Sequence, residues 1–146
     1  MHTTELNAVW GGGFAGEGFI KNPGFESVIS LPREFGGIGL GASPEDLLLN
    51  AVGSCYLITL GIVLEKRSIK HTLALKAHMD TELGPPPKVK RIILRPTVRV
   101  NQPDQLKIDV FERAKMMCLV SQALAGNVSI EVSPIILALD KGGESR

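Results

Sequence analysis

The chain has 146 residues, about the size of one ordinary domain, and we expect residues 1–146 to form a single domain. Hydrophobic residues make up 44% of it and charged residues 21%, which is a globular composition. The 16 basic and 15 acidic residues nearly cancel, which argues against a protein that coats nucleic acid or an anionic membrane. Its two cysteines, Cys55 and Cys118, are too few for a disulfide scaffold or a four-thiolate zinc site.

Two segments bear on the compartment. The first ten residues carry the polar Thr3, Thr4, Glu5 and Asn7 and lack the basic start and apolar core of a signal peptide, so we expect a cytoplasmic protein. Residues 47–64 carry no charge and reach the length of a membrane span. They also contain Asn50, Gly53, Ser54 and Thr59, and the segments that follow alternate like strands that need a covering layer. We therefore expect a buried core helix and no membrane contact.

The first third of the chain predicts a three-stranded meander. Residues 3–10, 14–20 and 25–31 read as strands, with turns signalled by three glycines at 11–13 and by Pro23-Gly24. A glycine-rich loop over residues 32–42 follows. Ser43 is then a good N-cap, Pro44 suits a first helical position, and Asp46 stands at capping-box distance. These signals predict a helix over residues 44–67.

The rest of the chain predicts strands and two further helical pieces. Residues 69–80 and 89–100 alternate like strands, and Pro96 indicates an edge strand or a bulge. Pro103 is expected to open a second helix, a short helical piece ends near Gly126, and a last strand over 128–139 is interrupted at Pro134. The predicted order is βββ-α-ββ-αα-β. The fold class is α+β, with a mainly antiparallel sheet packed on one long central helix.

The two cysteines lie 63 residues apart, so spacing alone does not bring them together. One interpretation is two buried thiols that act as small hydrophobic side chains. The other is a reactive thiol with a resolving thiol, in which the first is oxidised to sulfenic acid and the second condenses with it to a disulfide. Such chemistry needs a thiolate. Cys118 is expected at the start of a short helix, where free N–H groups lower a thiol's pKa. Cys55 has no such groups in its own helix, so a lowered pKa would require a partner from another part of the protein.

Two segments carry a family resemblance. Residues 39–55, GLGASPEDLLLNAVGSC, resemble the signature of the OsmC/Ohr family of organic hydroperoxide reductases. Residues 114–128, AKMMCLVSQALAGNV, resemble the segment around that family's second cysteine, and the loop over 31–41 resembles the lead-in of its OsmC-like branches. The resemblance covers nearly the whole chain, with the segments in the same order.

This resemblance implies an OsmC-like intertwined homodimer with central helices and outer sheets. It implies that Cys55 attacks an organic (alkyl or fatty-acid-type) hydroperoxide, that Cys118 resolves the product, and that the carboxylate of Glu45 orients the site. The resemblance implies that a dithiol, such as one of the lipoyl type, restores the thiols, and it implies no metal or tightly bound cofactor. The family also uses an arginine from its N-terminal sheet. Here no arginine precedes Arg33, which is the nearest candidate for substrate binding, with Lys21 as another.

Spacing adds an independent argument for a dimer. Ten residues separate Glu45 from Cys55, or about 15 Å along one straight helix. If Glu45 serves Cys55, it must come from a second subunit, for example across two antiparallel helices related by an axis near Asn50. Ala51, Gly53 and Ser54 would permit the close approach. The alternative is that Glu45 only favours the helix dipole.

Other interpretations stay open. The chain could be a non-catalytic stress-response protein that holds a small acyl-type ligand at a dimer interface, or a structural protein with inert thiols. Arg91, Arg95 and Arg99 share one face of a predicted strand and form either an anion-binding stripe or, as we favour, a solvated face. The positions of the histidines and cysteines along the chain do not match the ligand spacing of a zinc site. The aromatic residues of the first hairpin, Trp10, Phe14 and Phe19, form either part of the core, as we favour, or the lining of an apolar pocket for an acyl or alkyl peroxide.

Overall fold

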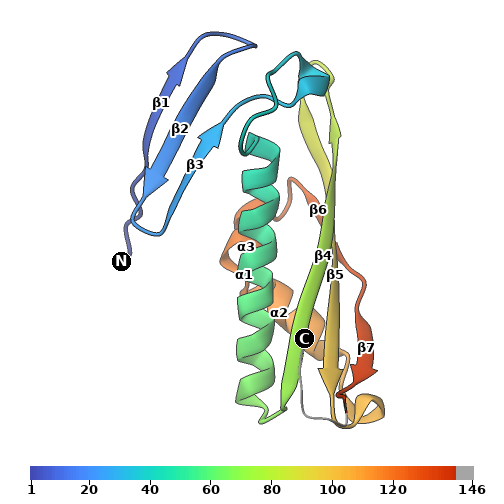
Figure 1. Ribbon diagram of the computed structural model, residues 1–146. Coiled ribbons are helices and arrows are strands. Elements are labelled where there is room, and N and C mark those ends of the chain that lie inside the picture. Colours follow the sequence, from blue (N-terminus) through green and yellow to red (C-terminus); the bar gives the residue numbers. More distant parts are fainter. Residues whose placement is uncertain (141–146) are drawn as a thin grey trace. The chain divides into compact units, whose positions relative to one another are not determined.

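The computed structural model describes residues 1–140. It contains two compact units, Met1–Leu48 and a second that starts at Leu49. Each unit has its own β-sheet (Figure 1). That the whole chain folds as a single domain stays a prediction.

The first unit is the predicted meander. Strands β1 (Asn7–Gly11), β2 (Glu17–Asn22) and β3 (Phe25–Ile29) pair antiparallel in sequence order. The first two strands begin four and three residues later than the alternation predicted. The glycines at 11–13 and the Pro23-Gly24 turn join them as expected. The prediction of the meander is therefore confirmed, with shorter strands.

The expectation that the hairpin aromatics form a core is wrong. Trp10, Phe14 and Phe19 keep 46%, 74% and 38% of their surface exposed. The reason is that β1 to β3 form a single three-stranded layer, and a lone sheet of this size has no second layer of its own to cover these side chains.

Hydrogen bonds hold the glycine-rich loop next to the end of β3. The Ser30 hydroxyl donates to the Leu40 carbonyl at 2.6 Å and accepts from the Leu40 amide at 2.7 Å. A short 3₁₀ helix, η1 (Arg33–Phe35), lies within the loop. Gly41 has a φ of 69°, and a Cβ there would collide with the backbone carbonyl of Val28. Glycine is required at this point because the loop passes so close to β3.

Helix α1 (Pro44–Lys66) follows at once. The predicted capping box is confirmed: the Asp46 amide donates to Ser43 Oγ and the Ser43 amide donates to Asp46 Oδ2, both at 3.1 Å. At the other end, Ser68 adopts a left-handed φ of 57° and the Ile69 amide donates to the Leu64 carbonyl at 3.0 Å. This is a Schellman-type stop in which serine occupies the place usually held by glycine.

The second unit has a sheet centred on one long strand. Strands β4 (His71–Glu82) and β5 (Lys88–Val100) pair antiparallel, whereas β6 (Ser129–Val132) and β7 (Ile135–Ala138) both pair parallel with β5. The α+β class with mainly antiparallel pairing is confirmed. The split of the last strand at Pro134 is also confirmed.

The prediction that Pro96 marks an edge strand or a bulge is wrong. Its strand, β5, has neighbours on both sides, and the only register shift between β4 and β5 is at Asp80/Thr81. On the far side of β5, β6 pairs up to Leu94 and β7 begins at Thr97. Pro96 falls in this gap, where its missing N–H group costs the sheet no hydrogen bond.

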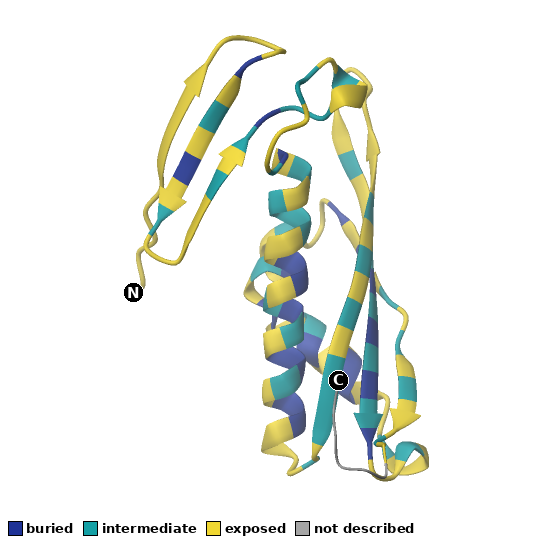
Figure 2. Ribbon diagram, viewed as in Figure 1, coloured by how far each residue is buried: buried dark blue, intermediate teal, exposed yellow. Residues whose placement is uncertain are grey.

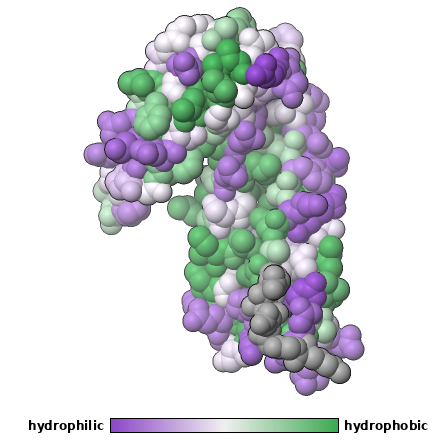
Figure 3. Space-filling view, in the orientation of Figure 1, coloured by the Kyte–Doolittle hydropathy of each residue, from purple (hydrophilic) through white to green (hydrophobic). Residues whose placement is uncertain are grey.

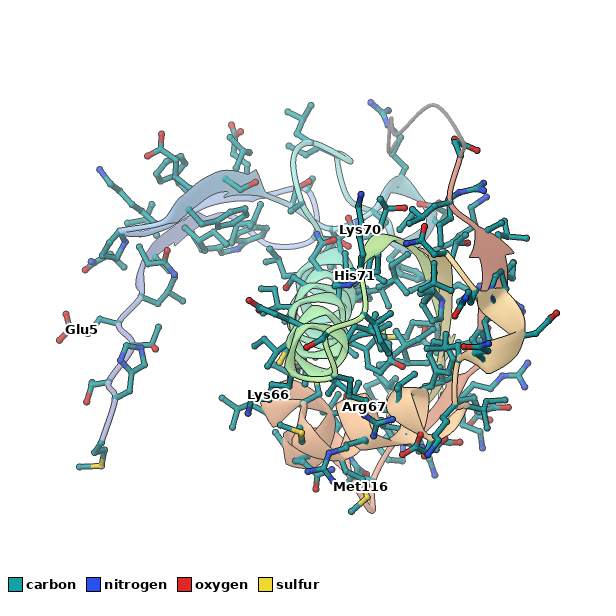
Figure 4. All side chains as sticks on the ribbon, turned by 90° about the horizontal axis from the view of Figure 1, so that it is seen from below. Glu5, Lys66, Arg67, Lys70, His71 and Met116 are labelled. Carbon is teal, nitrogen blue, oxygen red and sulfur yellow. The ribbon has the colours of Figure 1, made fainter. Side chains whose placement is uncertain are left out.

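Helix α1 packs along the sheet of the second unit. Its glycines make this possible, since a Cβ on Gly53 would lie 3.3 Å from Leu75 and one on Gly61 would lie 3.6 Å from Leu73. Gly53, expected to allow approach of a second helix, is thus buried against β4 instead. Figure 4 looks along α1 from the end marked by Lys66 and Arg67, with the sheet on one side and further helices on another.

Those further helices close the core. The 3₁₀ helix η2 (Pro103–Gln105) comes first, α2 (Asp109–Met117) begins six residues later than the expected start at Pro103, and α3 (Leu119–Leu124) follows. Leu106 is extended, which ends η2. The hydrophobic core draws buried side chains from every layer (Figure 2): Val52, Tyr56, Leu60, Val63, Leu64, Ile92, Leu94, Val98, Val100, Val110, Phe111, Ala114, Cys118, Val128 and Ile130.

Helix α1 is long and apolar enough to cross a membrane by length and composition alone. Core helices of globular proteins meet the same criterion. One face of α1 lies in the core just described, as expected for such a helix.

Candidate active site

The fold brings the two cysteines into contact within the second unit. Cys55 stands in the middle of α1, and Cys118 links α2 to α3 as the N-cap residue of α3. The Cys118 thiol donates a hydrogen bond to the Cys55 sulfur. Both thiols are free, and Cys55 is half-buried whereas Cys118 is buried. A solvent-accessible sulfur therefore has a second, sheltered sulfur beside it.

The surroundings of Cys55 favour its thiolate. Burial works against the charged form, but hydrogen bonds from the Val120 amide, the Cys118 thiol, the Leu119 amide and the Thr59 hydroxyl outweigh it and bring the pKa of Cys55 below its usual value. The groups that lower this pKa, among residues 1–140, are all neutral donors. The thiol is thus activated by oriented dipoles of α3 and α1.

The surroundings of Cys118 favour its thiol. Burial raises the pKa of Cys118, and the neighbouring Cys55 raises it further, by hydrogen bonding and by charge. The hydroxyl and the amide of Ser121 act in the opposite sense but do not outweigh these effects. As pH rises, Cys55 therefore ionises first while Cys118 keeps its proton, which is the order needed by a nucleophile and its partner.

Thr59 and Ser121 are site residues that sequence reasoning missed. Thr59 lies one helical turn after Cys55, and its hydroxyl also lies 2.7 Å from the Cys55 carbonyl. One hydroxyl carries one proton, so it donates either to this carbonyl or to the sulfur. Ser121 lies three residues after Cys118. A search for polar residues three or four positions from each cysteine would have found both.

Glu45 stands in the first turn of α1. Ten residues of helix separate it from Cys55, about 15 Å by helical rise, so the two are not brought together along α1. One carboxylate oxygen of Glu45 is buried and has no hydrogen-bond partner among residues 1–140. A role for Glu45 in orienting the site stays a prediction.

Arg33 belongs to the first unit. It starts η1 and lies over Gly39, where a Cβ would come within 2.8 Å of Arg33 Cγ. It lines an open pocket of about 320 Å³ together with Ser30, Glu34 and Asp46, among others. The acidic Glu34 and Asp46 thus share this pocket with the Arg33 guanidinium. A role for Arg33 in substrate binding stays a prediction.

Two other candidate sites are weaker. Arg91 donates from Nε to Asp80 Oδ2 at 2.6 Å, and Arg99 donates to the Ala138 carbonyl at 3.3 Å. These partners favour a solvated sheet face over an anion-binding stripe for Arg91, Arg95 and Arg99. Within residues 1–140 no group of three histidine, cysteine or acidic side chains is placed to hold a metal ion.

Comparisons with known proteins identify the family of this chain. The family model described as OsmC-like protein matches residues 36–133, a span that contains Glu45, Cys55 and Cys118. The chain is 30% identical over 151 residues to the uncharacterized protein YmaD of Bacillus subtilis, covering 98% of both chains. It is 23% identical to the organic hydroperoxide resistance protein of Xanthomonas axonopodis pv. citri, covering 91% of this chain and 94% of that one.

Solved structures show the same fold. The OsmC-like protein of Mycoplasma pneumoniae superposes with a TM-score of 0.76 at 14% identity, covering 93% of this chain and 98% of that one. The helices and strands described above therefore form a known fold. Within it, the two cysteines meet between a long helix and a short one. The chain belongs to the OsmC-like protein family, which includes organic hydroperoxide resistance proteins.

Proposed function

We propose that the protein is a thiol-dependent enzyme that reduces organic hydroperoxides, with Cys55 as the peroxidatic and Cys118 as the resolving cysteine. The observation that carries this proposal is the contact between the two sulfurs, in which a half-buried thiol of lowered pKa accepts a hydrogen bond from a buried thiol of raised pKa. Two inert core cysteines would not need this asymmetry.

The reaction proceeds in two steps on the protein. The Cys55 thiolate attacks the terminal oxygen of R–O–O–H, the O–O bond breaks, and the alkoxide takes up a proton and leaves as R–OH, so that Cys55 becomes a sulfenic acid. The Cys118 sulfur then attacks the Cys55 sulfur and expels hydroxide, which leaves as water after it takes the Cys118 proton. A dithiol reductant supplies two electrons and two protons and restores both thiols.

The proposal includes a homodimer that completes the site. An exposed stripe on α1, made of Ala51, Ser54, Ile58 and Ile62, runs beside Cys55, and Ile58 is 65% exposed. Figure 3 shows hydrophobic side chains at the surface in the region of α1. Such a stripe is typical of a helix that packs against a second protein surface. The unpaired buried oxygen of Glu45 supports the same idea, because a carboxylate without a donor is costly.

The test is turnover with a dithiol. Wild-type protein with dihydrolipoamide is expected to consume cumene or tert-butyl hydroperoxide catalytically, and Cys55→Ser is expected to abolish consumption because the nucleophile is lost. Cys118→Ser should stop at a sulfenic acid that dimedone traps. Equal slow consumption by the wild type and by Cys55→Ser would contradict the proposal. An acyl ligand that raises the melting temperature of both proteins equally would then favour the binding-protein alternative.

A further inference from the structure

An open pocket with a positive lining lies where the end of α1 meets α2. Its volume is about 310 Å³, and the residues among 1–140 that line it are Val63, Lys66, Arg67, Arg113 and Met117. Three of these side chains are cationic and none is acidic. Figure 4 shows Lys66 and Arg67 at this end of α1, on the side where α2 and α3 lie. We call this the basic pocket, and the reaction proposed above makes no use of it.

The positive charge of the basic pocket is only partly neutralised. Arg67 donates to both carboxylate oxygens of Asp109, at 2.9 and 2.8 Å, so its guanidinium is already engaged by an acid. Lys66 and Arg113, in contrast, form no ion pair within residues 1–140. Two cations therefore remain beside the apolar, buried Val63. A few charged groups over an apolar lining fit a ligand that carries both an anion and an apolar part.

The two helices that form the basic pocket lie side by side. The ion pair of Arg67 with Asp109 joins the end of α1 to the start of α2. Further along, the Tyr56 hydroxyl donates to the Phe111 carbonyl at 3.1 Å. We call the line along which the helices meet the α1–α2 seam. Because Tyr56 directly follows Cys55, this seam leads from the basic pocket to the reactive sulfur.

The seam has the length and the polarity to hold an extended apolar chain. Cys55, Ile62 and Lys66 stand at i, i+7 and i+11 on one face of α1, and the rise from the first to the last is about 16 Å. Between these ends, Ile62 of α1 and Met117 of α2 are 41% and 44% exposed. A second subunit on the exposed stripe of α1, which includes Ile62, would close this path from the solvent side.

We propose that the basic pocket binds the anionic end of a long-chain amphiphile, a carboxylate or a phosphate, whose apolar chain follows the α1–α2 seam toward Cys55. Lys66 and Arg113 hold the anion, and Val63 and Met117 contact the first part of the chain. This binding site goes beyond the proposed function, because such a molecule binds whether or not it carries a hydroperoxide.

The first measurement is titration calorimetry with dodecanoate and with dodecyl phosphate, on reduced protein and without peroxide. The double variant Lys66→Gln/Arg113→Gln is expected to bind both ligands about tenfold more weakly, because two exposed ion pairs with the ligand are lost. Dodecanol has no charge and should bind the wild type and the variant equally. The anion that binds the wild type more tightly identifies the group for which the pocket is built.

The second measurement locates the apolar chain. Iodoacetamide alkylates Cys55 in the presence of saturating dodecanoate or of butyrate, and the rate is read by peptide mass. Dodecanoate is long enough to reach along the seam and should slow the alkylation severalfold in the wild type. Butyrate, held by the same two cations, is too short to reach the sulfur and should leave the rate unchanged.

The matched control removes the same two charges elsewhere. Lys76→Gln/Arg95→Gln changes residues that face each other on β4 and β5, and it should bind both anions like the wild type. Unchanged affinity in Lys66→Gln/Arg113→Gln would overturn the proposal, as would an equal loss in the two double variants or alkylation that dodecanoate does not slow. A protein that binds dodecanoate as expected but turns over no hydroperoxide would support this site and contradict the proposed function.

Discussion

Cys55 and Cys118 touch each other, yet their sulfurs are in different electrostatic surroundings. The Cys55 sulfur lies near two amides, a thiol and the Thr59 hydroxyl, and their combined effect on its pKa outweighs that of burial. Cys118 is buried more completely and faces the charge of its partner. The site therefore selects one nucleophile from two chemically identical residues, without a cation among the groups that lower the pKa of Cys55 in the described part of the chain.

The first prediction concerns the pH dependence of alkylation. A thiol reacts only as its thiolate, so a lowered pKa keeps Cys55 reactive toward iodoacetamide at pH values where an ordinary cysteine is protonated. Cys118→Ala removes one of the donors to Cys55, and the midpoint of its alkylation profile should move to higher pH. The measurement is the rate of Cys55 alkylation against pH by peptide mass. An identical midpoint in both proteins would show that the thiol contact does not activate Cys55.

The second prediction concerns the stop of α1. Ser68 holds a left-handed φ of 57°, a region that costs residues with a Cβ about 1–2 kcal/mol. Ser68→Gly should therefore raise the free energy of unfolding by about 1 kcal/mol, part of the gain being offset by the greater freedom of glycine in the unfolded chain. Ser68→Ala, which keeps the Cβ, is the matched control and should give no gain. Urea unfolding of the three proteins decides the matter.

At the scale of elements, Tyr56 ties α1 to α2. Its side chain is fully buried, and its hydroxyl donates to the Phe111 carbonyl at 3.1 Å. Burial raises the pKa of Tyr56 well above its usual value, so the phenol stays neutral and keeps its donor. Because α2 leads directly to Cys118, this hydrogen bond also helps to fix the second sulfur opposite the first.

The third prediction follows from that tie. Tyr56→Phe keeps the ring in the core but removes the hydrogen bond, and should lower the free energy of unfolding by about 1 kcal/mol. Denaturant unfolding measures the loss, with the slope of the transition expected to stay unchanged. A variant as stable as the wild type would mean that the hydroxyl does not hold the two helices together.

Elements with strong local signals could be predicted from the sequence. The capping box of Ser43 and Asp46 set the start of α1, and the alternation from Ile69 to Met79 placed the inner face of β4. Pro96 and Pro103 misled because local preference does not say which strands will flank a proline or how long an extended link precedes a helix. The parallel pairing of β6 and β7 depends on contacts distant in sequence, which periodicity does not encode.

At the scale of the molecule, both units expose apolar surface. The first unit exposes aromatic side chains of its sheet, and α1 exposes the stripe with Ile58 and Ile62. Exposed apolar groups of this kind mark interaction surfaces. A homodimer in which the stripe of α1 is covered would also put a second chain beside Cys55, where a carboxylate or a cation from that chain could act.

The fourth prediction tests that dimer. Ile58→Asp places a charge in the stripe, and we expect it to shift the protein toward monomer in sedimentation velocity and to lower peroxidase turnover. Leu83→Asp is the matched control, because Leu83 is also 65% exposed but lies in the loop between β4 and β5. Dissociation by neither substitution, with full activity in both, would contradict a composite site.

The site was predictable only in part, because sequence motifs identify single residues but not contacts between distant segments. The cysteines and Glu45 stand in sequence motifs, so they could be named as candidate site residues from the sequence alone. Their contact did need coordinates, because 63 residues of chain separate Cys55 from Cys118 and only the packing of α1 against α2 and α3 closes that distance. Thr59 and Ser121 act through geometry inside that contact and so were not singled out.

The most direct test of the account is a peptide map after a single oxidation. Reduced protein is treated with one equivalent of cumene hydroperoxide, the remaining thiols are alkylated without reduction, and the digest is read by mass spectrometry. The account predicts one bridged species that joins the Cys55 and Cys118 peptides of the same chain, with the mass of two hydrogens lost. Recovery of both cysteines fully alkylated, with the hydroperoxide unconsumed, would contradict it.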